Sequence, residues 1–263
     1  MKILGCCAAM SLAMAIAPVG ARAAGPFDGT WTTKLDSIKI TSKPDVYALK
    51  DGVFTCGNCA PAFSIAADGA DHAVAGHSYY DTVAVAVVDE HTVRVTDKLG
   101  AKAIYETTYS VSADGKTLNQ VLKDMSGAKV ATWSQLSSRV AAGPPGSHAL
   151  AGSWKMEKMP GASDIGMTIT YQETPEGLQM HYNGMSYDAR FDGKPVPTAN
   201  DPGKTLVALR RISKDVIEET DTRAGAVTDV MRMTVSPDGK TMSVVDNNRT
   251  GDMTISYTMS KSP

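Results

Sequence analysis

Residues 68–97 read DGADHAVAGHSYYDTVAVAVVDEHTVRVTD, and residues 109–118 close the same stretch with YSVSADGKTL. A shift of 124 positions brings this stretch back without a gap, as residues 192–221 (DGKPVPTANDPGKTLVALRRISKDVIEETD) and 233–242 (MTVSPDGKTM). The turn tetrapeptide Asp-Gly-Lys-Thr and several strand dipeptides are identical at that shift. The chain therefore contains two copies of one unit, and such a repeat fixes the architecture before any single motif does.

Each copy is built from short segments that are β-branched or alternate between apolar and polar residues. Examples are Thr82–Val88, Thr92–Thr96 and Ile104–Ser112, and turn signals such as Lys50-Asp51-Gly52 separate segments of this kind. They recur at intervals of about 8–12 residues, which is typical of a small barrel or sandwich. Outside the N-terminal segment, no window has a helical period. The pattern predicts an all-β chain with two antiparallel barrels, since closure removes exposed sheet edges.

The N-terminal segment is typical of a cleaved secretory signal. Lys2 precedes an apolar run at residues 3–18, and Ala21-Arg22-Ala23 offers a cleavage site before Ala24. We therefore expect a signal peptide at 1–23, a first β domain at 24–140, a linker at 141–149 and a second β domain at 150–263. The linker is rich in Gly and Pro, which interrupt strands. The mature protein is predicted to be periplasmic or secreted.

Charge and hydropathy exclude several classes of partner. The formal net charge is −2 for 263 residues, and removal of Lys2 and Arg22 makes it about −4. There is no run of basic residues, which argues against nucleic acid or an anionic membrane surface as a partner. No later segment is long and apolar enough to be a transmembrane helix. The oligomeric state stays open.

Both copies begin with Gly-x-Trp, as Gly29-Thr30-Trp31 and Gly152-Ser153-Trp154. This resembles the start of lipocalin-like barrels, in which the Trp closes the barrel floor beneath a late basic residue. Arg139 is the candidate in copy one and Lys261 in copy two. The second half of each copy also resembles a widespread group of small exported bacterial proteins with a lipocalin-like fold, which share a DG pair, a hydrophobic strand and a closing S-x-DGKT turn. The resemblance implies two tandem lipocalin-like barrels that enclose a ligand, and no particular activity.

Two cysteines follow the signal segment, Cys56 and Cys59. An exported chain meets an oxidising compartment, so this pair predicts a structural disulfide. Two alternatives stay open, a zinc site completed by His72 and His77, and a redox-active pair. We expect neither a metal nor a cofactor.

In copy one, six titratable side chains lie within the eleven positions 71–81. These side chains are Asp71, His72, His77, Tyr79, Tyr80 and Asp81. One hypothesis makes His77 a catalytic base or a metal ligand that Asp81 or Asp71 orients, with Tyr79 and Asp81 on the same face. Asp71, His72 and Tyr80 would then contact the ligand. In an extended strand only one of Tyr79 and Tyr80 faces the same cavity as His77. The alternative is a solvated loop.

Copy two is instead rich in methionine, with ten of the fourteen in the chain. These side chains fill a core or form the soft wall of an apolar cavity. The aromatic pair Trp133 and Tyr257, equivalent between the copies, is interpreted as core packing.

No catalytic signature such as GxSxG or HExxH occurs in the chain. The leading interpretation is an exported protein that binds a small, partly apolar ligand inside a barrel. Two alternatives stay open. One is a hydrolase or isomerase that uses His77, Asp81 and a tyrosine. The other is an envelope interaction module without an internal site.

Overall fold

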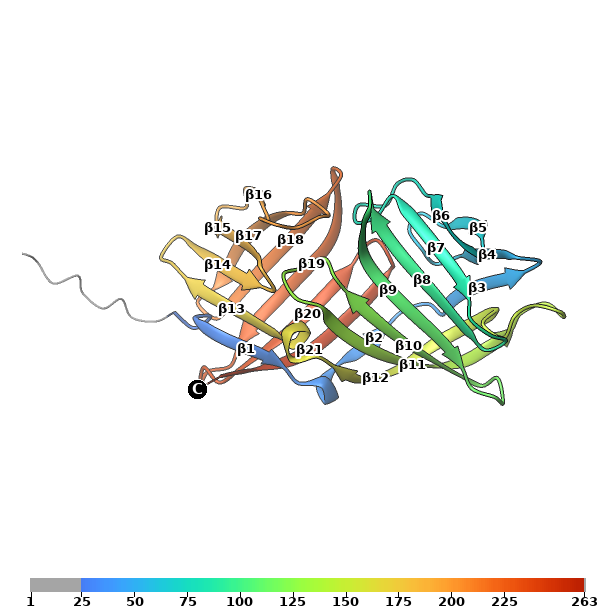
Figure 1. The fold of residues 1–263 in the computed structure, drawn as a ribbon. Coiled ribbons are helices and arrows are strands. Elements are labelled where there is room, and N and C mark those ends of the chain that lie inside the picture. The colour runs from blue at the N-terminus through green and yellow to red at the C-terminus, as the bar shows by residue number, and fades with distance from the viewer. Residues whose placement is uncertain (1–24, 263) are drawn as a thin grey trace, which may run out of the picture.

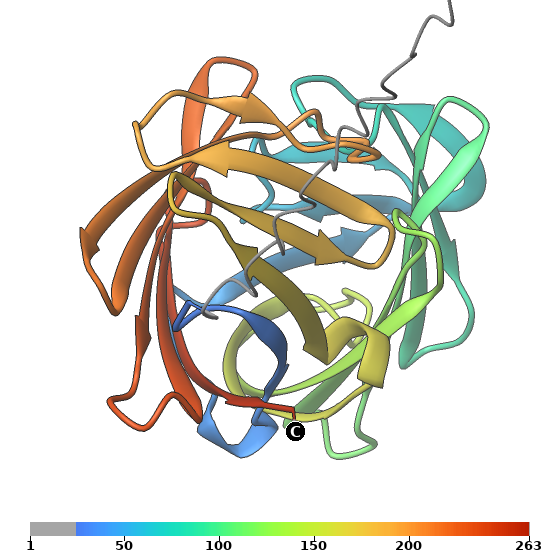
Figure 2. The same cartoon turned by 90° about the vertical axis from the view of Figure 1, so that its left-hand side faces the viewer.

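The computed structural model describes residues 25–262, so the expected signal peptide at 1–23 lies outside the described residues. The described chain forms two antiparallel sheets that curve into nearly closed barrels lying side by side (Figure 1). Figure 2, turned by 90°, shows how the strands of each barrel wrap around an interior. The structure confirms the prediction of an all-β chain with two tandem antiparallel barrels.

The N-terminal barrel is a ten-stranded sheet in the order β5-β4-β3-β12-β11-β10-β9-β8-β7-β6. Its strands are β3 (Asp45–Lys50), β4 (Val53–Cys56), β5 (Phe63–Ala66), β6 (Asp68–Ala73), β7 (Thr82–Val87), β8 (Thr92–Leu99), β9 (Lys102–Val111), β10 (Thr117–Asp124), β11 (Ala131–Ala142) and β12 (Gly152–Ala162). The predicted turn at residues 50–52 joins β3 to β4, where Asp51 and Gly52 both have positive φ.

The C-terminal barrel is an eleven-stranded sheet in the order β15-β14-β13-β1-β21-β20-β19-β18-β17-β16, with β2 paired to β21. Its strands are β1 (Gly29–Thr33), β2 (Lys39–Thr41), β13 (Thr168–Glu173), β14 (Gly177–Tyr182), β15 (Met185–Arg190), β16 (Val196–Pro197), β17 (Leu206–Ser213), β18 (Val216–Arg223), β19 (Ala226–Val235), β20 (Thr241–Asn248) and β21 (Met253–Lys261). The strands β7 to β10 recur as β17 to β20 at the shift of 124, as the repeat requires.

The two copies exchange their first strands. Strand β1, from the start of copy one, lies between β13 and β21 of the C-terminal barrel. Strand β12, from the start of copy two, lies between β11 and β3 of the N-terminal barrel. In Figure 1, blue β1 accordingly runs beside β13. Each sheet therefore combines strands from both sequence copies.

Two short helical turns follow the exchanged strands. The 3-10 turn η1 (Leu35–Ser37) comes after β1, and α1 (Asp164–Met167) comes after β12. A single turn is too short to leave a periodic pattern, so the sequence did not predict α1. The expected linker at 141–149 overlaps the end of β11.

The exchange also decides which cation covers which tryptophan. Trp31 and Trp154 are fully buried, one in the core of each barrel. The Cζ of Arg139 lies 3.9 Å from the centroid of the Trp154 ring, and Lys261 Nζ lies 4.9 Å from that of Trp31. The expected stacking of a late basic residue on the tryptophan is present. The expectation that Arg139 covers the tryptophan of its own copy is wrong, because β12 brings Trp154 to Arg139.

The exchange predicts a specific cross-link. Thr30 and Thr170 are direct partners of β1 and β13, and their Oγ1 atoms lie 3.0 Å apart. Opposed residues of antiparallel strands have the Cα spacing that a disulfide needs, about 4.5–5.5 Å. The double variant Thr30→Cys, Thr170→Cys is expected to form a disulfide, detected as the loss of two alkylation sites in the mass of unreduced protein.

The matched control is Thr30→Cys with Val46→Cys. Val46 pairs with Ser153, which occupies in β12 the place that Thr30 occupies in β1. Thr30 would face Val46 only if each copy kept its own first strand. A disulfide in the control and none in the Thr30–Thr170 pair would contradict the exchange.

Candidate functional site

A cavity of about 470 Å³ lies between the barrels and contains part of the predicted site. His77, Tyr79 and Tyr80 line it from the N-terminal barrel, and Arg223 and Asn248 line it from the C-terminal barrel. The segment at residues 74–81 connects β6 to β7 and is not a strand. The expectation that only one of Tyr79 and Tyr80 shares a cavity with His77 is therefore wrong, since the alternation of a strand does not apply there.

His77 sits among aromatic rings rather than beside a carboxylate. Its ring stacks on Tyr80 at 4.4 Å and meets the edge of Phe63 at 5.7 Å. Its Nε2 is buried and makes no hydrogen bond within residues 25–262. Burial lowers the pKa of His77, which keeps the imidazole neutral at neutral pH.

The carboxylates predicted to assist His77 have other partners. Asp81 accepts a hydrogen bond from the backbone N–H of Gly100 at 3.1 Å. Asp71 accepts two hydrogen bonds from Lys98 Nζ, at 2.6 and 2.8 Å. His72, predicted to contact the ligand, instead has its Nε2 atom 2.8 Å from Asp68 Oδ1. None of these three predicted site residues lines the cavity that His77, Tyr79 and Tyr80 share.

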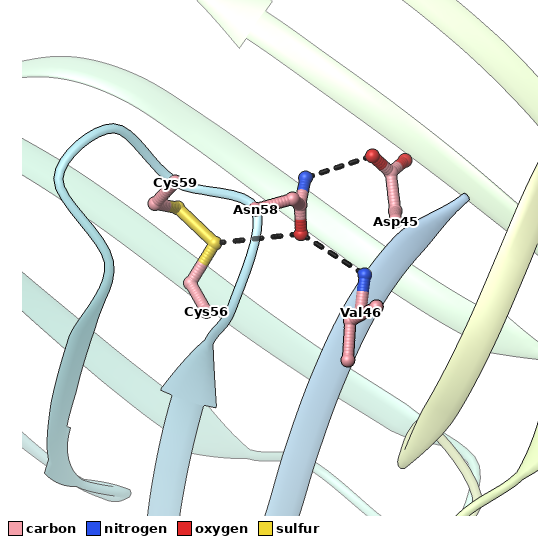
Figure 3. Close-up of a disulfide and its surroundings, with 5 residues drawn as sticks. All are labelled: Asp45, Val46, Cys56, Asn58 and Cys59. Carbon is pink, nitrogen blue, oxygen red and sulfur yellow. Dashed lines mark hydrogen bonds between the residues drawn. A yellow bond between two sulfur atoms is a disulfide. The ribbon is translucent and has the colours of Figure 1, made fainter. Parts of the chain in front are cut away.

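The disulfide Cys56–Cys59 closes the loop after β4 (Figure 3). Cys56 is 4% exposed and belongs to the core of the N-terminal barrel. Asn58, between the two cysteines, accepts a hydrogen bond from Val46 N at 3.1 Å and donates one to Asp45 Oδ1 at 2.7 Å (Figure 3). Asn58 thus holds the loop against the start of β3, and the disulfide leaves no thiolate for the zinc alternative.

A cavity of about 490 Å³, the first cavity, lies inside the N-terminal barrel. It is lined by Tyr105, Thr107, Tyr109, Gln120, Leu122, Asp124, Trp133, Ser134, Gln135 and Met159. Gln120 is 9% exposed, and its Nε2 has no hydrogen-bond partner in the described part of the chain. On the neighbouring strands it faces Tyr109 and Gln135. The first cavity thus combines aromatic walls with an unsatisfied buried amide.

The indole of Trp133 closes the first cavity beneath α1. A Cβ atom added at Gly166 would come within 2.8 Å of the Trp133 ring. Glycine at that position of α1 therefore allows the turn to pass directly over the indole. The interpretation of Trp133 and its counterpart Tyr257 as core packing holds for Tyr257, which packs against the core of the C-terminal barrel, and each of the two also lines a cavity.

A smaller cavity of about 300 Å³, the second cavity, lies inside the C-terminal barrel. It is lined by Thr33, Gly166, Met167, Thr168, Ile169, Tyr171, Met180, Tyr182, Glu219, Met231, Val244, Tyr257 and Met259. Methionine therefore supplies part of a cavity wall here, one of the two roles that the composition allowed. Glu219, 7% exposed, accepts a hydrogen bond from Tyr187 Oη at 2.6 Å.

Further acidic groups lie near Glu219 in the same barrel. Burial, reinforced by the charge of Asp221, raises the pKa of Glu219, and burial raises that of Asp221. Burial also raises the pKa of Asp246 to about 6. The Oδ1 atoms of Asp221 and Asp246 are buried without a hydrogen-bond partner in residues 25–262. Arg223 pairs with Asp229 at 3.2 Å and with Asp221 at 3.9 Å, so one cation is shared between two acidic groups.

The two interiors share their backbone register but differ in chemistry. At the shift of 124, Thr107, Gln120, Gln135 and Val95 correspond to Met231, Val244, Met259 and Glu219. The first cavity is aromatic and contains amides beside the carboxyl group of Asp124, and the second is rich in methionine and contains the carboxyl group of Glu219. The sequence analysis missed Gln120 and Glu219. The signal was available, because both differ between copies at inward-facing positions of equivalent strands.

Comparisons with known proteins found no match, so a function has to be argued from the fold and the cavities. No protein-family model matches the chain, and no curated protein or solved structure is significantly similar to it. Within residues 25–262, no helix has the length and apolarity needed to cross a membrane. In the same range, no group of three His, Cys, Asp or Glu side chains is arranged to hold a metal ion.

Proposed function

We propose that the protein is an exported, lipocalin-like binding protein that holds a small, partly apolar molecule in the first cavity. The observation that carries this proposal is the unpaired amide of Gln120 at the wall of that cavity. A buried polar group without a partner costs about 1–3 kcal/mol. A ligand that bonds to this amide recovers that cost, whereas a core without a ligand gains nothing from glutamine here.

The rest of the wall specifies the kind of ligand. Tyr105, Tyr109 and Trp133 offer ring faces, and Leu122 and Met159 add aliphatic surface. A volume of about 490 Å³ is within the usual range for small-molecule sites. The ligand is a molecule with a flat apolar body and at least one hydrogen-bonding group directed at Gln120.

Export is part of the proposal. Its supports are the disulfide Cys56–Cys59 and the signal-like sequence at residues 1–23. No contact in the described residues favours the alternative of a hydrolase or isomerase, since Asp81 bonds to Gly100 and not to His77. The predicted catalytic and ligand-contacting roles of His77, Tyr79, Asp81, Asp71, His72 and Tyr80 stay predictions.

The variant Gln120→Met tests this function. It keeps the length of the side chain and removes the unpaired amide, so the free energy of unfolding is expected to rise by about 1 kcal/mol. The affinity for the ligand is expected to fall, because the hydrogen bond to Gln120 is lost. Binding is measured as the change in Trp133 fluorescence on titration with fractions of an extract of the producing cells, and stability by urea denaturation.

Two control variants test whether a change in affinity arises at Gln120 and whether the fluorescence signal arises at Trp133. Asn119→Met changes a neighbouring residue of β10 whose side chain points to the opposite face of the strand, and it should leave affinity unchanged. Trp133→Phe should abolish the fluorescence change, because Trp31 and Trp154 do not line the cavity. Loss of stability in Gln120→Met together with unaltered binding would show that Gln120 serves only the core.

A further inference from the structure

We infer that the second cavity is a separate site for an organic cation, an amine or quaternary ammonium ion with a compact apolar body. This site differs from the first cavity in its barrel, its lining and its ligand chemistry. The inference stands on the composition of the wall, the position of Glu219 and the charges around it.

The wall of the second cavity suits a cation with an apolar body. Tyr171, Tyr182 and Tyr257 line it, and the face of a tyrosine ring attracts cations. Met180 and Met231 add polarisable sulfur and shapes that adapt to a ligand. Neither lysine nor arginine occurs among the described residues that line the cavity, so no protein cation competes for these groups.

Glu219 supplies the counter-charge. One of its oxygens accepts the hydrogen bond from Tyr187, and its carboxyl group forms part of the cavity wall. The equivalent residue of copy one is Val95, an apolar side chain that is buried in the core of the N-terminal barrel. The fold therefore does not need a carboxyl group at this position, and burying one is costly unless a partner repays it.

Acidic groups outnumber basic groups around Glu219. The titratable groups around it come from β13, β15, β18, β19, β20, β21 and the segment before β17, namely Tyr171, Tyr187, Asp221, Arg223, Asp229, Asp246, Tyr257 and Asp201. Arg223 is the single cation of this group; it bonds to Asp229 at 3.2 Å and to Thr205 Oγ1 at 2.8 Å, and it also pairs with Asp221 Oδ2 at 3.9 Å. Two buried oxygens, on Asp221 and Asp246, have no partner in the described chain. An organic cation in the cavity would offset this excess.

The site links binding to proton release. Burial raises the pKa of Glu219, so this carboxyl group carries a proton near neutral pH. A bound cation favours the ionised carboxylate, and the proton leaves to solvent. Affinity for a permanently charged ligand should therefore increase as the pH rises from 6 to 8.5.

Two probes that differ only in charge test the site. Choline and its uncharged carbon isostere, 3,3-dimethyl-1-butanol, are titrated into the full chain by calorimetry, together with larger quaternary ammonium ions. At pH 8.5 the ammonium ion is expected to bind at least about tenfold more tightly than the isostere. Its binding enthalpy should vary with the ionisation enthalpy of the buffer, which reports the released proton. Equal affinities for both probes, or no binding of any ammonium ion, would overturn the inference.

The variant Glu219→Gln keeps the shape of the side chain and its hydrogen bond to Tyr187 while removing the charge. It is expected to reduce the preference for the ammonium ion to near unity and to abolish the proton release. Asp97→Asn is the matched control, since it removes a carboxyl group with a raised pKa from the other barrel. This variant should leave the preference for the ammonium ion and the proton release unchanged. An unaltered preference in a folded Glu219→Gln variant would refute the role of this residue. Ligand binding in the first cavity depends on Gln120, so failure of either proposal leaves the other testable.

Discussion

Replacing Trp154 by alanine is expected to destabilise the N-terminal barrel, although Trp154 belongs to the second sequence copy. The fully buried indole packs beneath Arg139 and donates a hydrogen bond to the Leu150 carbonyl at 2.9 Å. Truncation of a buried tryptophan typically costs about 3–5 kcal/mol. Hydrogen exchange measured by mass spectrometry should show the largest loss of protection in β7 to β10.

The matched variant is Trp31→Ala. Trp31 is equally buried and donates to the Phe27 carbonyl at 2.8 Å, but it lies in the core of the C-terminal barrel. Its largest loss of protection is therefore expected in β17 to β20. If each variant instead deprotected the barrel formed by its own sequence copy, the strand exchange would be refuted.

Stability is expected to fall as the pH rises from 5 to 8. Burial raises the pKa of Asp97 to about 7, and it also raises the pKa of Glu219, Asp221 and Asp246. In the unfolded chain such carboxyl groups ionise near pH 4, so the folded state retains protons that the unfolded state has lost. This stabilisation is complete below about pH 4 and disappears as the pH passes the folded pKa values.

Asp97 alone contributes on the order of 3 kcal/mol to this effect, since pH 5 lies about two units below its folded pKa of about 7 and each unit corresponds to about 1.4 kcal/mol. His77 acts in the opposite sense below its ordinary pKa of 6.5, because burial disfavours its protonated form. Urea denaturation at pH 5 and pH 8 measures the balance. Asp97→Asn and Glu219→Gln should each flatten the dependence on pH, and a wild-type stability that rises over this range would contradict the assignment.

Much of the fold was predictable because the repeat and the period of two act locally. The strands of residues 82–124 and their counterparts at 206–248 follow from alternation and turn residues. The exchange was not predictable from these signals. Gly29-Thr30-Trp31 and Gly152-Ser153-Trp154 carry the same pattern, so the sequence of either strand fits either barrel.

The candidate site was predicted less well, for a related reason. Searching along the chain favoured the cluster at residues 71–81, where His77, Tyr79 and Tyr80 do share a cavity. The interiors of the barrels instead draw alternate residues from several strands, so the sequence around Gln120 or Glu219 does not reveal the cavity that each of them lines. Only a comparison of the two copies at inward-facing positions reveals them.

Native mass spectrometry of the protein, isolated from its own cells without denaturation, tests the binding function most directly. The account predicts a mass above that of the chain with its disulfide, which returns to the chain mass on denaturation and is absent for Gln120→Met. The chain mass alone for the wild type, with no adduct after incubation with any fraction of the cell extract, would contradict the proposal that the first cavity holds a ligand.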